Sequence, residues 1–371
     1  MPLSRRIFNT GLGSVFGAIV LFGRAFGGLS LSTRLVSAGR VGDAYHILYV
    51  MVMADSKFRV TIGPKLPGRA HGAAIYRSAA GGWIVTVARR PGRYLHITSI
   101  DSDGTPTSEG IFLSHGADHH FNGHAVFDPS GRFLYTTETR FNADTGQQSG
   151  IIGVYEVPSL RRVASWPTLG IDPHELVLHQ NGQVITVLNG GREMDPDFPR
   201  LQLNAGSISS SITSVDSGSG TVIQHSAGDM VAKNVSIRHL TVLDETVWWG
   251  GQLEENMPTG TPLIGSYTLE SGIDPNPVGG LARLGRYIGS IARVSNSNAA
   301  HVVVTNPRHD RAAIIDTTRR WVDSTVNIED VCGVAPSPLG VILSDGTGGI
   351  GTLSNRDRLA NIQWDNHLTA V

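Results

Sequence analysis

The sequence has a single cysteine, Cys332, among its 371 residues. One thiol excludes an internal disulfide and every zinc or iron–sulfur site built from several cysteines. Acidic and basic residues nearly balance, at 31 and 30, so the chain lacks the basic excess typical of nucleic-acid-binding proteins. A G-x-S-x-G nucleophile elbow and a C-x-x-C-H haem attachment motif are also missing. Hydrolases of the nucleophile-elbow type and proteins with covalently attached haem are therefore not expected.

After the N-terminal segment the sequence has no apolar run long enough to span a membrane. Residues 1–27 combine a basic start, a weakly apolar Gly-rich run and small residues in a cleavage-like arrangement. The adjacent Arg5 and Arg6, with Phe8 two residues on, resemble a twin-arginine export signal. An ordinary secretory signal or an uncleaved anchor is the alternative. We therefore expect residues 28–371 to form one mature domain that is located in the periplasm.

A repeated unit takes up most of the remaining chain, and sustained helical periodicity is missing. In each unit a short strand is followed by a turn containing Gly, Asn, Asp or Pro and by a returning strand. Successive units begin 42 to 65 residues apart, which is the spacing of four-stranded propeller blades. The six units begin, in order, at His71, His124, His174, His239, Ser290 and Cys332.

The two ends of the chain add further strands to these six units. The stretch TRLVSAGRVGDAYHILYVMVMADSKFRVTIG predicts about three strands, and LANIQWDNHLTAV predicts one more. Joined in one blade, they would close a ring with no long open edge. We therefore predict an all-β, seven-bladed β-propeller. Six or eight blades, or a pair of β-sandwiches, are the alternatives.

The first strand of each propeller blade lines the central channel, and the second strand returns to the same mouth. The first residues of the units are therefore expected to share that mouth. His119 and His120 are expected in the loop that crosses the same face. His71 is expected to face the region of Arg89, His124 that of Glu138 and His174 that of Asn189. Likewise we expect His239 to meet Gln252, Ser290 to meet Asn306, and Cys332 to meet Asp345.

The metal-ligand candidates are the four imidazoles at the unit starts, His71, His124, His174 and His239. Imidazoles without thiolates suit zinc, copper or iron. Nearby carboxylates would complete or orient such a site, and Glu138 and Glu175 are the candidates. One alternative is that Gly-His pairs, as in NGHAVF, are buried hydrogen-bond anchors. Another is a metal-free pocket in which Arg89, Arg238 and Arg308 bind an anion.

Three other features have simpler interpretations. The GTGGIG stretch at 346–351 matches a dinucleotide-binding pattern, but β-like sequence on both sides predicts a turn. Cys332 is expected to be a buried packing residue, with a reactive thiol as the alternative. Trp248 and Trp249 lie in an expected strand, where packing between blades accounts for at least one of them.

Five segments resemble, in the same order, a bacterial family of twin-arginine-exported propeller proteins of unknown function. They are GHAVFDPSGRFLYTTE, GIDPHELVLHQNGQVITVLNGG, SIRHLTV, DVCGVAPSPLGVILSDGTG and WDNHL. Members are often encoded beside imelysin-type and other periplasmic iron-uptake proteins, which implies a role in handling iron or another metal. The resemblance carries over the four histidines, with Glu138, Glu175, Arg238, Cys332 and Asp345 beside them. The chain departs from the family at NGGREMDP, where members usually have Thr and His after the acidic residue.

Three functions remain open at this point. The first is a periplasmic metal-associated binding protein in iron acquisition, with periplasmic iron-uptake proteins as partners. The second is a propeller enzyme, either a redox centre or a lactonase-like hydrolase with Glu138 or Glu175 as base. The third is a metal-free interaction scaffold, because propellers serve all three purposes. We expect a monomer that binds iron, copper or zinc and does not bind nucleic acid.

Overall fold

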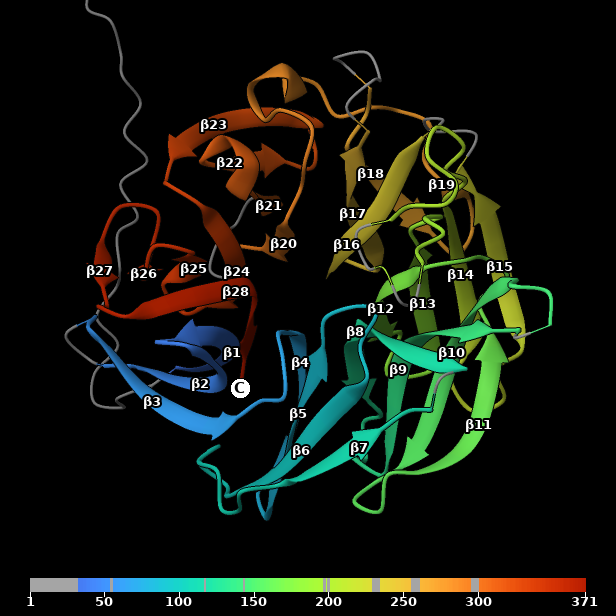
Figure 1. Ribbon diagram of the computed structural model, residues 1–371. Helices are drawn as coiled ribbons and strands as arrows, with labels where there is room; N and C mark the ends of the chain where they lie inside the picture. Colours follow the sequence, from blue (N-terminus) through green and yellow to red (C-terminus); the bar gives the residue numbers. More distant parts are fainter. Residues whose placement is uncertain are drawn as a thin grey trace, which may run out of the picture. The chain divides into compact units, whose positions relative to one another are not determined.

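The computed structural model describes residues 33–53, 56–116, 118–142, 144–195, 198, 201–228, 234–254, 261–294 and 300–371. The 28 strands in these residues form seven four-stranded antiparallel sheets arranged around one axis (Figure 1). The protein is therefore a seven-bladed β-propeller, as predicted. The described residues include no α-helix and no helix long and apolar enough to cross a membrane. The predicted export signal at residues 1–27 lies outside them.

Six blades are continuous in sequence, and each begins with its innermost strand. From the axis outwards, blade 2 is β4 (Ala70–Ser78), β5 (Gly81–Ala88), β6 (Tyr94–Ile100) and β7 (Ile111–Ser114). Blade 3 is β8 (His119–Phe127), β9 (Phe133–Phe141), β10 (Gln148–Glu156) and β11 (Arg161–Pro167). Blade 4 is β12 (Pro173–His179), β13 (Val184–Asn189), β14 (Ser211–Asp216) and β15 (Val222–Ala227). Blade 5 is β16 (Val235–Leu243), β17 (Thr246–Leu253), β18 (Ile264–Thr268) and β19 (Gly272–Ile273). Blade 6 is β20 (Ser290–Arg293), β21 (His301–Asn306), β22 (Arg311–Asp316) and β23 (Trp321–Asn327). Blade 7 is β24 (Val331–Ser337), β25 (Gly340–Asp345), β26 (Gly349–Gly351) and β27 (Arg356–Arg358).

Blade 1 joins the two ends of the described chain. Its order from the axis is β28 (Ile362–Ala370), β1 (Arg34–Val41), β2 (Ala44–Val52) and β3 (Phe58–Lys65). The red strand β28 lies beside the blue strand β1 in Figure 1 and pairs with it antiparallel. The predicted closure of the ring is therefore confirmed. A strand from the far end of the sequence also lines the channel as a result.

Sequence pattern explains which strand occupies which layer of a blade. Second strands are apolar runs that are buried on both faces, as in β13, whose six residues VITVLN are all buried. Outermost strands alternate instead, and β11 shows exposed and half-buried residues in strict succession. Two short 3₁₀ helices, η2 (Leu281–Arg283) and η3 (Pro307–His309), lie in connections around blade 6.

The apolar core lies between neighbouring blades as a series of separate clusters. The largest joins blades 4, 5 and 6 and includes Trp248 and Trp249, which are both buried in β17 as predicted. Another joins blades 7 and 1 and contains Cys332. Burial raises the pKa of the Cys332 thiol to about 12, so this residue packs as an unreactive thiol. Residues 346–348 of the GTGGIG stretch form the predicted turn between β25 and β26, and residues 349–351 are β26.

A histidine cluster as candidate metal centre

Five innermost strands each place one histidine in the channel. Nine of the ten imidazole pairs have ring centroids 4.5 to 6.3 Å apart. All five side chains are buried, so the cluster lies inside the channel and not at an open mouth. We call this group the histidine cluster; its members are His71 of β4, His124 of β8, His174 of β12, His239 of β16 and His367 of β28.

Backbone irregularities turn these side chains toward the axis. The pairing register shifts between Ala70 and Ala73, which brackets His71, and between Phe121 and Ala125, which brackets His124. Corresponding shifts occur at the other three histidines. A β-bulge frees a residue from the ladder and changes the direction of its side chain, which is common next to functional sites.

Two glycines make room for the rings. Gly123 has a φ of +106°, and a Cβ there would lie 2.6 Å from His71 Cδ2. A Cβ on Gly72 would lie 2.7 Å from the Gly123 carbonyl oxygen and 3.0 Å from His124 Nδ1. The Gly-His neighbours in these two strands are therefore a packing requirement of the cluster.

Glu175 lies beside the outer nitrogens of two rings and hydrogen-bonds one of them. His239 Nδ1 lies 3.2 Å from Glu175 Oε2, and His124 Nδ1 lies 3.8 Å from Oε1. The Leu240 amide also donates to this carboxyl group. A carboxylate on Nδ1 fixes the proton there and leaves Nε2 as the free ligand atom, the usual arrangement behind metal-binding histidines. Because burial raises the pKa of Glu175 to about 8, this carboxyl group would take that form near pH 7 only with a cation close by.

Two further rings have the same orientation. His367 Nδ1 lies 3.3 Å from the Ser290 hydroxyl, and His71 Nδ1 faces Asp365 at 3.9 Å. The Nε2 atoms of these two rings lie 3.3 Å apart inside the cluster. Four imidazoles thus direct Nδ1 outward and Nε2 inward.

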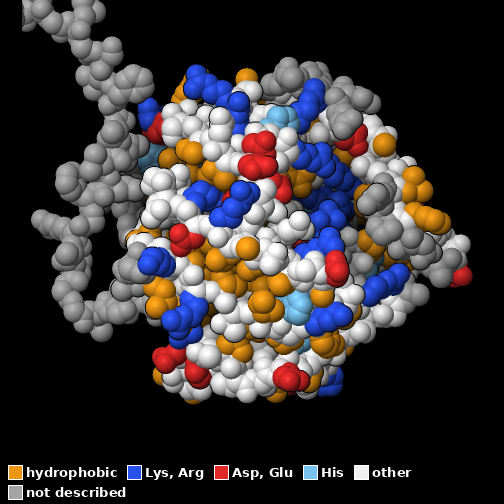
Figure 2. Space-filling view, turned by 60° about the vertical axis from the view of Figure 1, so that its left-hand side comes forward, with side chains coloured by type: hydrophobic (Ala, Val, Ile, Leu, Met, Phe, Trp, Pro, Cys, Tyr) orange, Lys and Arg blue, Asp and Glu red, His pale blue; other side chains and the backbone are white. Residues whose placement is uncertain are grey.

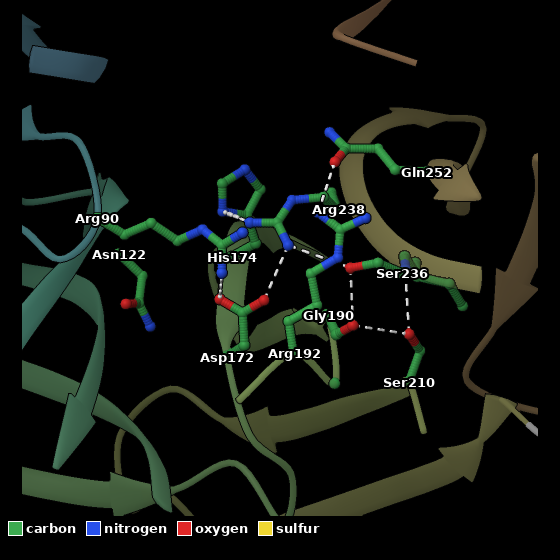
Figure 3. A network of polar contacts seen from close by, with 12 residues as sticks. Arg90, Asn122, Asp172, His174, Gly190, Arg192, Ser210, Ser236, Arg238 and Gln252 are labelled. Atoms are coloured by element: carbon green, nitrogen blue, oxygen red, sulfur yellow. Dashed lines mark hydrogen bonds and ion pairs between the residues drawn. The ribbon is translucent and has the colours of Figure 1, made fainter. Parts of the chain in front are cut away.

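His174 is the exception. Arg238 Nη2 donates a hydrogen bond to His174 Nδ1 at 2.9 Å, and its other terminal nitrogen donates to Asp172 at 2.8 Å (Figure 3). Because a guanidinium only donates, the neutral His174 ring must carry its proton on Nε2. That N–H points at His71 Nε2, 3.3 Å away, so His174 is a hydrogen-bond donor to the cluster.

The rings are neutral near pH 7. Burial, followed by neighbouring positive groups, lowers the pKa of His71, His124, His174 and His239 well below the usual value. Burial also lowers the pKa of His367 to about 4. Neutral imidazole is the form that binds metal ions. His124 Nε2 is buried without a hydrogen-bond partner in the described part of the chain. One ring nitrogen from each of His124, His239 and His367 lies within 4.8 Å of the others.

The two sides of the cluster differ. Innermost strands all run the same way, so residues that follow the histidines lie on one side and residues that precede them lie on the other. The following residues line a cavity of about 320 Å³, which His124, Glu175 and His367 also border. On the preceding side lie Asp172 and Arg238, which are 3% and 2% exposed. Access to the rings is therefore from the cavity.

Sequence comparison assigns the chain to a family. The family described as "Protein of unknown function (DUF1513)" matches residues 64–371. The chain belongs to this family. No curated protein matches this DUF1513 chain.

Solved structures resemble the DUF1513 chain in fold only. A chain of Kuenenia stuttgartiensis hydrazine synthase is 13% identical with a TM-score of 0.55, covering 88% of this chain and 95% of that one. A chain of a nidogen/laminin complex is 10% identical with a TM-score of 0.49, covering 91% and 98%. At these identities, the likeness to the hydrazine synthase chain carries no information on activity.

Glu138 does not face His124 as predicted; it pairs with Phe121 because the register shifts before His124. Its side chain is fully buried between strands of blade 3, where the Tyr155 hydroxyl donates to it at 2.7 Å and Arg162 at 2.5 Å. Burial would raise the pKa of Glu138, but the His115 hydrogen bond and the Arg162 charge outweigh it and hold the pKa at about 2. In the DUF1513 chain this carboxylate is a structural ion, away from the channel.

The other predicted pairs meet in the expected regions but are offset by one or two residues. Gln252 pairs with Ser236 and not with His239, and Asn189 pairs with Pro173. Bulges cause the offsets at the histidines and at Cys332, whereas Ser290 pairs with Thr305 in a regular register, one residue before Asn306.

The groups displaced in this way lie outside the histidine cluster. Asn189 donates to the Thr168 carbonyl, and Asn306 caps η3. Asp345 holds the turn after β25 and accepts from Arg356. Arg89, at the end of β5, is exposed.

His119 and His120 are wrongly predicted to lie in a loop; they begin β8. His120 is buried against Phe141, with ring centroids 5.0 Å apart, and His119 Nδ1 lies 2.9 Å from Asp118. Of the three histidines near this hairpin, only His124 therefore joins the cluster.

Sequence reasoning missed His367. The predicted C-terminal strand included it, in WDNHL, but that strand was treated only as ring closure. Because a closing strand at the axis is an innermost strand, the polar residues of WDNHL were the available signal. Asp172 and Arg192 in the connections of blade 4 were also missed.

Proposed function

We propose that the channel of this DUF1513 protein binds one transition-metal ion through His124, His239 and His367, with His71 as the fourth ligand. The observation that carries this proposal is the shared orientation of the four rings. Nδ1 lies 3.2–3.3 Å from an oxygen in His239 and His367 and 3.8–3.9 Å from a carboxyl oxygen in His124 and His71, one ring nitrogen each of His124, His239 and His367 lies within 4.8 Å of the others, and the Nε2 of His124 is buried without a partner. Buried polar atoms are normally paired, so an empty lone pair among neutral imidazoles favours a missing cation.

The spacing of the nitrogens suits tetrahedral coordination. Two nitrogen ligands at 2.0–2.1 Å from a tetrahedral ion stand about 3.3 Å apart. The Nε2 atoms of His71 and His367 have that separation, 3.3 Å. An all-imidazole site suits zinc, copper, iron or nickel, and copper(II) is expected to bind most tightly among the divalent ions. In the metal-free protein the His174 N–H donates to His71 Nε2; binding of His71 to the ion would break this hydrogen bond and leave the N–H to donate to another group bound to the ion.

Titration of the chelator-treated full chain with Zn²⁺ and Cu²⁺, in competition with a chromophoric chelator, tests the proposal. We expect one ion per chain. His239→Ala and His367→Ala should each weaken binding by about tenfold or more, because each removes one of the ligands. The matched control is His225→Ala, since His225 is exposed on the outermost strand β15. Equal affinity in all four proteins would overturn the assignment.

The cellular role follows from the resemblance and the N-terminal motif. We propose that residues 1–27 direct twin-arginine export, that residues 28–371 act as one domain in the periplasm, and that the bound ion belongs to iron or other metal uptake with periplasmic partner proteins. Cell fractionation of wild type against a variant with Arg5 and Arg6 replaced by Lys tests the export step. Periplasmic protein in the double variant at wild-type level would contradict it.

A metal-dependent hydrolase is the second candidate, because Glu175 borders both the cluster and the cavity. Burial raises the pKa of Glu175 to about 8, and a nearby cation would lower it again toward the range of a general base. Turnover of simple lactones and aryl esters by the zinc-loaded chain, lost in Glu175→Gln, would support this activity. No turnover by the loaded wild type would eliminate it.

A further inference from the structure

A layer of arginines lies on the side of the channel that precedes the histidines. Arg90 donates to Asp172 Oδ1 at 2.6 Å, and Arg238 donates to Oδ2 at 2.8 Å (Figure 3). Arg192 reaches the same region from the connection after β13 and donates to Gln252 at 3.1 Å. We call Arg89, Arg90, Arg192 and Arg238 the arginine layer.

The arginine layer has more positive charge than its neighbours neutralise. Asp172 is the one carboxylate that forms an ion pair with it among the described residues, and it is shared by Arg90 and Arg238. Glu254 and Asp365 attract Arg192 and Arg89 from further away without an ion pair. Arg192 has a buried Nε without a hydrogen-bond partner. Burial and the Arg238 charge lower the pKa of Arg90 to about 9 and of Arg192 to about 10. Buried charges are normally paired, so this excess is the signature of an unfilled anion position.

Arg89 extends the layer to the channel mouth. It is exposed, and its guanidinium group has no hydrogen-bond or ion-pair partner in the described part of the chain. Tyr287 is an electrostatic neighbour of both Arg89 and Arg192, and so is Arg90, so Arg89 and Arg192, which come from blades 2 and 4, lie in one region. Arg308 stacks on the Tyr287 ring at 4.4 Å. Figure 2 shows Lys and Arg side chains gathered in a hollow of the face that it displays.

The neighbouring pair at the axis behaves differently. Arg69 forms two hydrogen bonds to Asp365, at 2.6 and 3.0 Å, and so has its own counter-ion. Arg89 and Arg192, by contrast, form no ion pair among the described residues, although Arg192 donates a hydrogen bond to Gln252.

We infer that the arginine layer binds a small multivalent oxyanion, a polycarboxylate or a phosphate, held by the Arg89 and Arg192 guanidinium groups above the Arg238–Asp172 pair. Guanidinium groups match carboxylate and phosphate oxygens in paired hydrogen bonds, and several of them favour an anion with several charges. This site does not depend on the proposed metal, because its groups are separate from the histidine ligands.

Isothermal titration of the chelator-treated full chain with citrate, inorganic phosphate and sulfate, each against acetate, tests the inference. We expect at least one multivalent anion to bind at least tenfold more tightly than acetate, and to bind more weakly at high salt. Comparison of citrate with phosphate shows whether the site prefers a polycarboxylate or a phosphate. Arg89→Gln and Arg192→Gln should each weaken it by about tenfold. Arg89 has no partner to lose, so its variant should fold normally.

Two controls separate this site from the metal site. Arg319→Gln, which removes an exposed arginine paired with Asp316 and Asp323 on blade 6, should bind the anion like wild type. His239→Ala should lose metal affinity and keep anion affinity. No heat with any multivalent anion, or equal affinity in Arg89→Gln, Arg192→Gln and wild type, would overturn the inference.

Discussion

Two buried polar groups in this propeller differ in how completely they are paired. In blade 3, Glu138 accepts hydrogen bonds from Thr136, Tyr155 and Arg162, so its carboxylate oxygens are fully used. In the channel, the histidine cluster holds five imidazoles, yet His124 Nε2 and His71 Nδ1 have no hydrogen-bond partner within the described residues. Burial of polar groups is therefore not by itself a sign of function.

The two groups differ in whether every polar atom and charge has a partner within the protein. A structural network supplies its own donors and counter-charge, as Arg162 does for Glu138. The channel instead collects neutral lone pairs at one point and arginine charge beside them. On our proposals a metal ion would complete the lone pairs and an anion would complete the arginine charge. The following tests compare the Glu138 network with the channel.

The largest effect is expected from breaking the Glu138 network. Arg162→Met leaves the buried Glu138 charge without its cation and should lower the free energy of unfolding by about 3 kcal/mol. Denaturant unfolding measures this change. Arg161→Met, which removes an exposed ion pair to Glu156, is the control and should cost less than about 1 kcal/mol. Metal affinity of folded Arg162→Met should equal that of wild type, and a parallel loss would mean that the two groups are coupled.

The histidine cluster and the Glu138 network should affect the pH dependence of stability in different pH ranges. His367 has its pKa lowered from 6.5 to about 4 by folding, so its contribution is complete above pH 6.5 and is lost as pH falls towards 4. Glu138, held at about 2, loses its contribution only below about 4.5.

Replacing His367 by Gln should therefore reduce the stability loss of the metal-free protein between pH 6.5 and 5 by about 2 kcal/mol. Urea unfolding at a series of pH values measures it. Parallel curves for the variant and wild type across this window would show that the folded ring titrates normally.

A smaller effect is expected at the glycine between the rings. Gly123→Ala places a Cβ 2.6 Å from His71 and an L-residue at a φ of +106°, which should cost roughly 1–2 kcal/mol. Because the displaced ring is a proposed ligand, zinc affinity should fall as well. Thermal unfolding and zinc titration measure the two consequences. Unchanged zinc affinity would show that His71 does not contribute to binding.

The smallest effect is expected at the lone thiol. Cys332 packs between blades 7 and 1 and its Sγ lies 3.2 Å from the Asp365 carbonyl. Cys332→Ala should cost about 1 kcal/mol or less and leave zinc affinity unchanged. Any loss of metal from this variant would place sulfur in the site and contradict an all-imidazole centre.

The blade plan could be predicted from sequence because each blade repeats the same hairpin signal. All six predicted unit starts, from His71 to Cys332, fall in or at the start of innermost strands, and the chain ends share blade 1. The convergence of the first four histidines followed from that plan, since equivalent positions of a ring meet at its axis.

The groups around the cluster could not be predicted in the same way. The bulges shift the register at each histidine, so Glu138 and Gln252 do not lie opposite His124 and His239. A bulge depends on local backbone geometry and leaves no clear mark in the residue pattern. The arginine layer was missed because Arg192 and Asp172 come from connections, where periodicity gives no position.

Crystals of the zinc- or copper-soaked protein, measured at the absorption edge of the metal, test the central claim most directly. The account predicts one anomalous peak in the channel, about 2 Å from Nε2 of His124, His239 and His367, with His174 still bonded to Arg238 through Nδ1. No peak among these rings at saturating metal, or a peak only at another site of the chain, would contradict it.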